Sequence, residues 1–328
     1  MAHKLTIREN GFAEMAFVGQ TPWHGLGQEL AQDADMETWR KAAGMDWTIE
    51  KAPVIYIPEN LEKSQFAQAT HFHGQNVLYR SDTKAPLSVV TDRYKPVQPH
   101  EVLEFFDALV KESGFRLHTA GTLFGGKRMW ALAETGRFGE VSKGDGIGGF
   151  LLLSTSADRT LSTTARFTTV RVVCNNTLSM ATNDKSHCVS FTHARKFDHD
   201  LMRAKLGKAV ENFGAFMEMS KFLKKQQMDI GKAKMFVTHL LLDSDKWHDH
   251  LAVENIHKSK GYNKILSLFG SDAKGIEMAG HTKWGMLNAV TEYYDHHIPT
   301  RTADARLNST WFGTGDAIKQ KAINLLTA

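Results

Sequence analysis

The stretch GGFLLLSTSADRTLSTTARFTTVRVVCNNTL, residues 148–178, decides the fold expected for this chain. Its first apolar run, Phe150 to Ser154, follows two glycines and is typical of a buried strand. The segment ADRT, residues 157–160, follows and is polar enough to form a turn. The run from Ser162 to Val173 is rich in Thr, Val and Phe, which suit a pleated surface. Two such runs with a short polar link between them predict a β-hairpin.

The pattern changes around Cys174. Asn175 or Asn176 is predicted to cap a helix, because Asn is a favoured N-cap residue and Leu178, Met180 and Ala181 would continue it. The stretch therefore predicts strand, strand and helix.

Three arginines lie in this stretch: Arg159 near the turn, then Arg166 and Arg171. Side chains alternate along a strand, so Arg166 and Arg171 are expected on opposite faces of the sheet. No Asp or Glu lies between Asp158 and Asp184 to neutralise them. Two interpretations stay open, a solvated sheet face and an anion-binding hairpin whose natural ligand would be a phosphate backbone.

The composition is that of an ordinary globular protein of one or two domains. The chain has 328 residues, 42% of them hydrophobic and 23% charged, and a formal net charge of +4. This charge allows a nucleic-acid partner without requiring one. With only two cysteines, no apolar run long enough to span a membrane and no signal-peptide pattern, the chain is expected to be soluble and cytoplasmic.

Residues 1–50 are predicted to form an N-terminal cap, and residues 51–195 a β-rich core domain. The cap combines an aromatic, glycine-rich loop at residues 21–27 with a short helix over residues 35–44. Strands are then predicted over residues 52–57, 76–80 and 86–90, and a helix over residues 101–113, where apolar residues recur three and four apart.

A second hairpin is predicted around Gly125-Gly126, because a Gly-Gly pair supplies the positive φ that tight turns need. Its strands would cover residues 115–123 and 127–134, so Lys127 and Arg128 emerge directly from the turn. The sequence GTLFGGKR, residues 121–128, approaches the phosphate-binding loop of nucleotide hydrolases. Arg128, however, occupies the place of the metal-binding hydroxyl, and a strand rather than a helix is expected to follow, so no ATP hydrolysis is expected. Residues 144–149, GDGIGG, are predicted to form a loop.

Residues 196–328 are predicted to form an α-helical C-terminal region. Helical spacing of apolar residues covers four segments, residues 197–225, 229–242, 284–294 and 317–326. The predicted fold class is thus α+β: a central antiparallel β-sheet built from hairpins followed by a helix, and a helical C-terminal region.

Three possible chemical sites are interpreted as structural. His71 and His73 would share one strand face, as metal ligands do, but no carboxylate or cysteine cluster accompanies them. Asp295-His296-His297 is similar to a phosphoesterase signature without its aspartate-rich companion motifs. Cys174 follows two valines and is interpreted as a buried thiol.

Two motifs, RVVCNNTL at residues 171–178 and WGMLNAVTEY at residues 284–293, together resemble the phage/plasmid-like protein family, a domain-of-unknown-function family of mobile elements. Further stretches carry the likeness across nearly the whole chain: residues 21–27, 94–98, 126–130 and 312–315. The family names no reaction.

A second resemblance concerns the pattern of elements alone. Hairpins followed by a helix, with basic residues on the hairpins, are similar to the core of ring-forming single-strand annealing proteins. That resemblance implies ATP-independent binding and annealing of single-stranded DNA in phage or plasmid recombination, by a closed homo-oligomer with no cofactor and no covalent reaction.

The candidate contacts to the nucleic-acid backbone are basic residues of the two hairpins. Trp130 and Phe167 are aromatic enough to stack on bases, but core packing is favoured for both. Two alternatives remain, a metal-dependent nuclease or hydrolase and a non-enzymatic host-interaction protein. The preference for DNA over RNA is open. The candidate backbone contacts are Lys127, Arg128, Arg159, Arg166 and Arg171.

Overall fold

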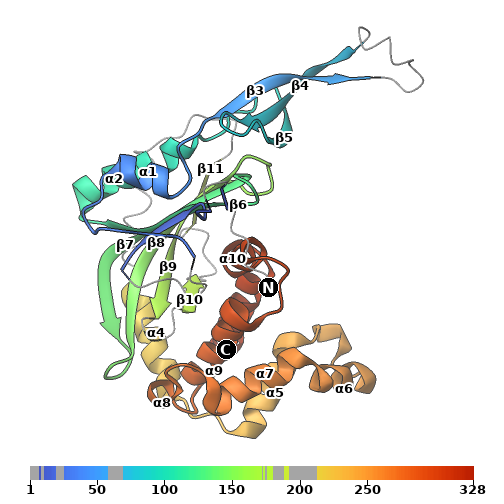
Figure 1. The fold of residues 1–328 in the computed structure, drawn as a ribbon. Coiled ribbons are helices and arrows are strands. Elements are labelled where there is room, and N and C mark those ends of the chain that lie inside the picture. Colours follow the sequence, from blue (N-terminus) through green and yellow to red (C-terminus); the bar gives the residue numbers. More distant parts are fainter. Residues whose placement is uncertain are drawn as a thin grey trace.

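The computed structural model describes residues 7–8, 11–19, 26–57, 69–171, 173, 176–179, 188–191 and 213–328. The fold is α+β, as predicted, with a large sheet in the middle of the molecule and helices on both of its faces (Figure 1). Among the described helices, none is long and apolar enough to cross a membrane.

The large sheet has the order β10-β9-β8-β7-β6-β1-β2, and β11 also pairs with β9. Both predicted hairpins are confirmed, because β6 pairs with β7 and β8 pairs with β9 in antiparallel register. Only β1 and β2, among the described pairs, run parallel. The strands are β1 (Met15–Val18), β2 (Gln28–Leu30), β6 (Arg116–Leu123), β7 (Arg128–Glu140), β8 (Gly146–Ser156), β9 (Thr163–Arg171), β10 (Asn176–Ser179) and β11 (Cys188–Phe191).

Two local predictions are wrong. The segment Asn176–Ser179 is strand β10, not a helix, because it pairs with β9 and its Thr177 amide donates to Asp295 Oδ2 at 2.7 Å. The predicted loop at residues 144–149 is partly strand, because β8 already begins at Gly146. Its glycines suit a strand here: a Cβ on Gly149 would lie 2.7 Å from the Phe167 ring. Close packing therefore explains this glycine-rich strand.

Helices α1 (Met36–Ala42) and α2 (Pro99–Ser113) cover one face of the sheet (Figure 1). Both predictions of these helices are confirmed. Asp35 caps α1 by accepting from the Thr38 amide, and the Gln98–Glu101 capping box starts α2. Their apolar sides pack on a buried cluster that includes Ala131 and Leu151 of the sheet. Because β1 pairs with β6, residues of the predicted N-terminal cap contribute a strand to the central sheet; the domain boundaries stay a prediction.

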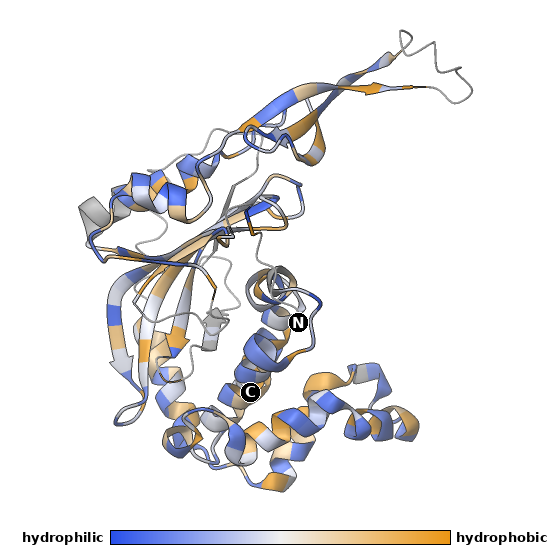
Figure 2. Ribbon diagram, viewed as in Figure 1, coloured by the Kyte–Doolittle hydropathy of each residue, from blue (hydrophilic) through white to orange (hydrophobic). Residues whose placement is uncertain are grey.

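A second, three-stranded sheet projects from the body as an arm (Figure 1). It consists of β3 (Ile49–Tyr56), β4 (Thr70–Arg80) and β5 (Pro86–Thr91), in the predicted places but with longer strands. Figure 2 shows hydrophobic stretches along the arm, and Ile55, Tyr56 and Phe72 are each about half exposed. The arm therefore carries apolar side chains into solvent.

The C-terminal region is helical, as predicted. Asp229 caps the second predicted helix by accepting from the Lys232 amide, and residues 197–212 of the first lie outside the described residues. On the second face of the sheet, Trp311 packs on Trp130 with ring centroids 4.7 Å apart. The helices are α4 (Phe213–Lys225), α5 (Ile230–Leu241), α6 (His250–Lys258), α7 (Lys260–Ser267), α8 (Ile276–Ala279), α9 (Lys283–Glu292), α10 (Ala303–Phe312) and α11 (Thr314–Thr327), with single turns at Ser244–Lys246, Leu268–Asp272 and Tyr293–His297.

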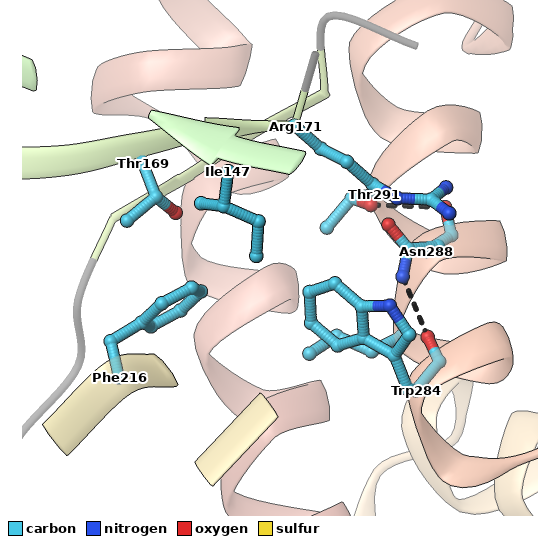
Figure 3. A pocket seen from close by; sticks show the side chains of 8 residues that line it. Ile147, Thr169, Arg171, Phe216, Trp284, Asn288 and Thr291 are labelled. Atoms are coloured by element: carbon cyan, nitrogen blue, oxygen red, sulfur yellow. Dashed lines mark hydrogen bonds between the residues drawn. The ribbon is translucent and has the colours of Figure 1, made fainter. Parts of the chain in front are cut away.

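A buried ion pair joins the sheet to the helices. Arg171 Nε donates to Asp145 Oδ1, and the other oxygen of Asp145 accepts from Trp284 Nε1 at 2.9 Å. Arg171 also donates to the main-chain oxygens of Lys274 and Gly275 at 3.1 and 2.9 Å. Beside Trp284 (Figure 3), the packing leaves a cavity of only about 10 Å³, room for about one water. This contact is therefore a docking interface between sheet and helices.

A second buried ion pair, between Lys319 and Asp295, also lies where the sheet meets the helices. Lys319 of α11 donates to Asp295 Oδ1 and to the Thr177 main-chain oxygen, both at 2.7 Å. Lys319 is 1% exposed and Asp295 3% exposed, so each depends on the other for charge neutralisation. The interpretation of the Asp295-His296-His297 motif as structural is supported by this pairing.

The Arg171 pair predicts a large loss of stability when its acid is removed. Asp145→Ala removes the carboxylate that pairs with the guanidinium of Arg171, whose side chain is 3% exposed. We expect the free energy of unfolding in urea to fall by about 3 to 5 kcal/mol. Glu254→Ala is the matched control: it breaks the exposed Lys258–Glu254 pair and should cost less than about 1 kcal/mol. Equal losses for the two variants would contradict the role given to Arg171.

Candidate nucleic-acid interface

Three hairpin turns meet at one end of the molecule. Arg80, at the end of β4, donates to the main-chain oxygen of Gly125 in the β6–β7 turn at 3.3 Å. Ser88 of β5 donates to the Ala157 oxygen in the β8–β9 turn at 2.5 Å. The Ala157 amide in turn donates to the Lys127 oxygen at 2.8 Å. The base of the arm and the turns of the two predicted hairpins are therefore held together at one place.

Several cations lie at this end of the molecule, and the described residues supply no acidic partner for them. We call this region the tip surface. It consists of Arg93, Lys95, Phe124, Lys127, Arg128, Arg159 and Thr160. Among the described residues, no carboxylate lies within ion-pairing distance of Lys127, Arg128 or Arg159. Arg128 Nη2 donates to the neutral hydroxyl of Thr160 at 2.7 Å, and that hydroxyl donates to Asp158. Arg159 is exposed, and Lys127 and Arg128 are half-buried. Within the described part of the chain, the positive charge of these three residues therefore has no acidic partner.

Sequence reasoning missed two further cations of the tip surface. Arg93 and Lys95 are exposed on either side of Tyr94, whose hydroxyl donates to the Ser156 oxygen at 3.1 Å. This bond places their loop beside the β8–β9 turn. Burial, and then the negative charge of Asp158, raise the pKa of Tyr94 to about 12, so the phenol stays neutral. The sequence signal that could have indicated them is the pair of cations on either side of Tyr94, the first residue of the motif YKPVQ.

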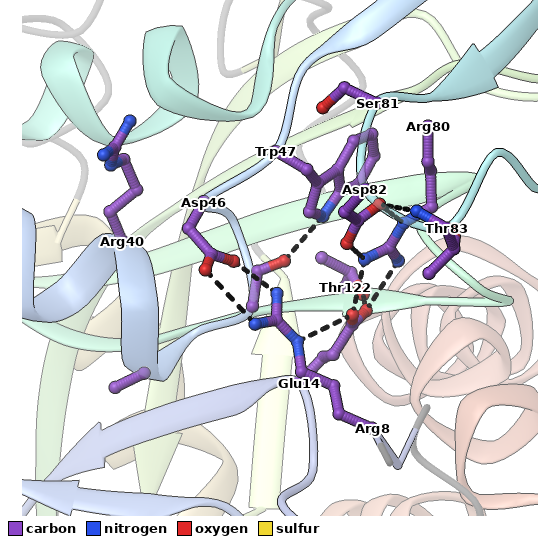
Figure 4. Close-up of polar contacts among 12 residues, drawn as sticks. Arg8, Glu14, Arg40, Asp46, Trp47, Arg80, Ser81, Asp82, Thr83 and Thr122 are labelled. Carbon is purple, nitrogen blue, oxygen red and sulfur yellow. Dashed lines mark hydrogen bonds and ion pairs between the residues drawn. The ribbon is translucent and has the colours of Figure 1, made fainter. Parts of the chain in front are cut away.

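A hydrogen-bond network around the buried side chains of Arg80 and Glu14 lies next to the β6–β7 turn, where Arg80 also contacts Gly125 (Figure 4). Arg80 Nη2 donates to Glu14 Oε1 and to Asp82 Oδ2, both at 2.7 Å, and its guanidinium carbon lies 4.2 Å from the centre of the Trp47 ring. Thr122 of β6 donates its hydroxyl to the other Glu14 oxygen. The network thus ties together the N-terminal segment, the arm and the central sheet.

The same network extends outward through Arg8, which pairs with both Glu14 and Asp46. Beside Arg8 lies an open cavity of about 470 Å³, a volume that suits a small molecule. Its charged lining residues are already paired, Arg8 with Asp46 and Lys41 with Glu37. The described lining of this cavity therefore offers no unpaired charge that would select a ligand.

The glycine-rich loop serves packing rather than phosphate binding. Gly125 and Gly126 have φ of +70° and +91°, as the predicted tight turn requires, and strand β7 follows at Arg128. A Cβ on Gly126 would lie 2.6 Å from the Trp47 ring. The glycine is thus needed where Trp47 covers the turn, and the helix of a phosphate-binding loop is absent at this point of the described chain.

The five residues predicted to contact the nucleic-acid backbone do not lie together. Arg166 shares a sheet face with Leu152 and pairs with Asp316 of α11 at 2.8 Å, whereas Arg171 shares a face with Ile147. Their predicted opposite orientation is confirmed. Because Arg171 is 3% exposed and paired, it does not reach the tip surface. Only Lys127, Arg128 and Arg159 are brought together there.

The remaining candidate residues also have structural surroundings. Trp130 and Phe167 are each 1% exposed, which confirms core packing over base stacking. The rings of His71 and His73 lie 6.4 Å apart on the arm, but among the described residues no group of three His, Cys, Asp or Glu side chains could hold a metal. Cys174 and most of the residue 21–27 loop lie outside the described residues.

Replacing each glycine of the β6–β7 turn by alanine separates packing from backbone strain. At Gly125 a Cβ would meet nothing within 4 Å, so only the positive φ opposes it, at about 1 kcal/mol. At Gly126 the clash with Trp47 should add about 1 to 3 kcal/mol. Urea unfolding of Gly125→Ala and Gly126→Ala measures both, and equal costs would show that Trp47 does not constrain the turn.

The ionisation of Asp82 makes the stability of the fold depend on pH. Burial by itself would raise the pKa of Asp82, but hydrogen bonds from Arg80 and the Thr83 amide lower it to about 2. A lowered pKa means that the carboxylate stabilises the fold above its ordinary value of 3.8 and that this contribution is lost as pH falls toward 2.

The corresponding variant is Asp82→Asn. Because the side chain is 36% exposed, we expect a loss on the order of 1 kcal/mol at pH 7, after allowing for solvent screening. Unfolding measured from pH 7 to pH 2 should show this difference from the parent protein shrinking below about pH 4. Asp33→Asn, at an exposed position, is the control. A difference that stays constant with pH would rule out a titrating Asp82–Arg80 pair.

Comparison with known proteins places the chain in a family. No curated protein and no solved structure matches the sequence. One family model matches residues 86–311, more than half of the chain, and covers β5, both hairpins and the helices up to α10. The model is described as Domain of unknown function (DUF932), and the protein belongs to this family.

Proposed function

We propose that the protein binds single-stranded nucleic acid through the tip surface and anneals complementary strands without ATP. The observation that supports this most is the convergence of Lys127, Arg128 and Arg159, from two adjacent turns, without an acidic partner among the described residues. Arg93 and Lys95 extend the same positive surface. A row of unpaired cations attracts a chain of phosphates, because each contact releases a condensed counterion.

The proposed binding depends on the backbone and not on base sequence. Lys127 lies in the turn between β6 and β7, and Arg159 lies in the turn between β8 and β9. Both side chains are cationic donors that suit the phosphate oxygens of any sequence. Phosphate contacts are the same for every base, so affinity should vary little with sequence and strongly with salt.

Annealing of complementary strands is an activity that sequence-independent binding can support without a nucleotide cofactor. Two strands repel each other through their phosphates, and cations that neutralise them lower this repulsion. On this proposal the protein acts in recombination on mobile elements and forms closed homo-oligomers that place several tip surfaces along one strand. No covalent step is involved.

The double variant Lys127→Ala with Arg159→Ala tests the interface. Both residues lie in turns, outside the paired positions of the strands, so the core should stay intact. We expect weaker binding of labelled single-stranded DNA of any sequence. The slope of log affinity against log salt should fall by about 0.7 for each phosphate that the variant no longer binds.

A charge-matched control is Arg116→Ala with Lys234→Ala. Arg116 begins β6, the end of that strand away from the turn, and Lys234 is exposed on α5. This variant has the same net charge as the test variant but keeps the tip surface. Unchanged affinity and salt slope in the folded Lys127→Ala, Arg159→Ala protein would rule out the proposed interface.

A further inference from the structure

Three residues near the tip surface have positive φ, although each carries a side chain that makes this conformation unfavourable. In the described chain, three residues other than glycine have positive φ: Lys84 at 57°, Phe124 at 55° and Arg159 at 64°. They lie in the β4–β5, β6–β7 and β8–β9 turns, the three turns that meet at the tip surface. Positive φ is uncommon for residues with a Cβ, and for a bulky residue such as Phe it is a clear outlier.

Phe124 keeps part of its ring in solvent although its backbone is strained. Its neighbour Leu123 is fully buried, but Phe124 itself remains 37% exposed. Glycine would adopt the same turn without strain, as Gly125 and Gly126 do in the next two positions. Strained side chains held at a surface are a feature of binding sites, where the strain sets the direction of a functional group.

The surroundings of Phe124 suit a flat, electron-rich ligand beside phosphates. The guanidinium carbon of Arg128 lies 5.6 Å from the centre of the Phe124 ring, a cation–π arrangement. Thr160 holds Arg128 through the 2.7 Å hydrogen bond, and Asp158 accepts from the Thr160 hydroxyl. The ring thus has an ordered cation beside it, and Lys127 follows in the same turn.

We infer that Phe124 stacks on an unpaired base and makes the tip surface selective for single strands over duplexes. This inference rests on the proposed function and names the ligand of the same site. A phenyl ring has no hydrogen-bonding group with which to read base edges, so what it offers a nucleic acid is its face. In a duplex, neighbouring base pairs cover the base faces, whereas a single strand can turn a base outward.

The cations and the ring then have separate roles. Lys127, Arg128 and Arg159 contact phosphates and set the salt dependence, which duplex and single strand share. Phe124 adds affinity only where a base face is free. Selectivity for single strands therefore comes from one side chain, without dependence on base identity.

The first test is Phe124→Gly, which removes the ring and relieves the positive φ. The relief of strain opposes the loss of the ring's partial burial, so the variant should remain folded, and urea unfolding checks this. We expect its affinity for a short single-stranded oligonucleotide to fall about fivefold or more, with an unchanged salt slope and an unchanged affinity for the duplex of the same sequence. Phe124→Trp should retain the single-strand affinity. Phe138→Ala, which removes an exposed Phe at the other end of β7, is the matched control and should bind like the parent protein.

The second test changes the ligand, so its measurement on the parent protein needs no folding assumption. Single strands in which every base is replaced by an abasic site keep their phosphates but have no face to stack on. The parent protein should bind them at least about fivefold more weakly than intact strands, and Phe124→Gly should bind both alike.

The outcomes separate this inference from the proposed function. If Phe124→Gly binds single strands like the parent protein, or loses duplex affinity equally, stacking is wrong. The backbone-binding proposal then still stands, provided that the Lys127→Ala, Arg159→Ala variant binds weakly. If that double variant is also unaffected, both proposals fail.

Discussion

The buried ion pair between Glu14 and Arg80 is the interaction on which the arrangement of the arm and the hairpin turns depends. The two side chains are 1% and 3% exposed, and they join the N-terminal segment to the base of the arm. Burial by itself would lower the pKa of Arg80, but Asp82 and Glu14 raise it, so the guanidinium stays charged. Such a pair adds little net stability compared with apolar packing, but removing one partner leaves a buried charge. It therefore fixes one arrangement of the arm and the hairpin turns.

Two other buried pairs fix the helical region in the same way. Arg171 and Asp145 belong to the sheet and a neighbouring loop, whereas Lys319 and Asp295 belong to the C-terminal helices. The contacts that cross between the two layers are hydrogen bonds of these residues: from Arg171 to the Gly275 oxygen, from Trp284 to Asp145 and from Lys319 to the Thr177 oxygen. The motifs of residues 171–178 and 284–293 supply Arg171, Thr177 and Trp284 to these contacts. The most recognisable sequence features of this chain therefore hold its layers together, and the proposed function resides in the turns.

The difference between core and turn positions explains why the cations of the tip surface are not paired with carboxylates of the described residues. Arginines on the inner faces of the sheet meet carboxylates, because an unpaired charge in the core costs far more than one in water. At the turns, Arg159 is exposed and Lys127 is half-buried, so neither charge lies in the core. Their charges are then available to a phosphate chain, and the buried network next to the β6–β7 turn keeps the turns close together.

Local sequence patterns were enough to predict the two hairpins, α1, α2 and the helical C-terminal region, because strand alternation, helix caps and the Gly125-Gly126 turn are encoded within a few residues. They also placed Lys127, Arg128 and Arg159 at turns, and Arg166 and Arg171 on opposite faces. Tertiary structure alone decided that residues 176–179 form a strand, since Thr177 is held by Asp295, 118 positions away. It also decided which arginines are neutralised, and that Phe124 stays exposed while Trp130 is buried. The partner of a charge or a ring is set by packing between distant segments, and no local pattern contains that information.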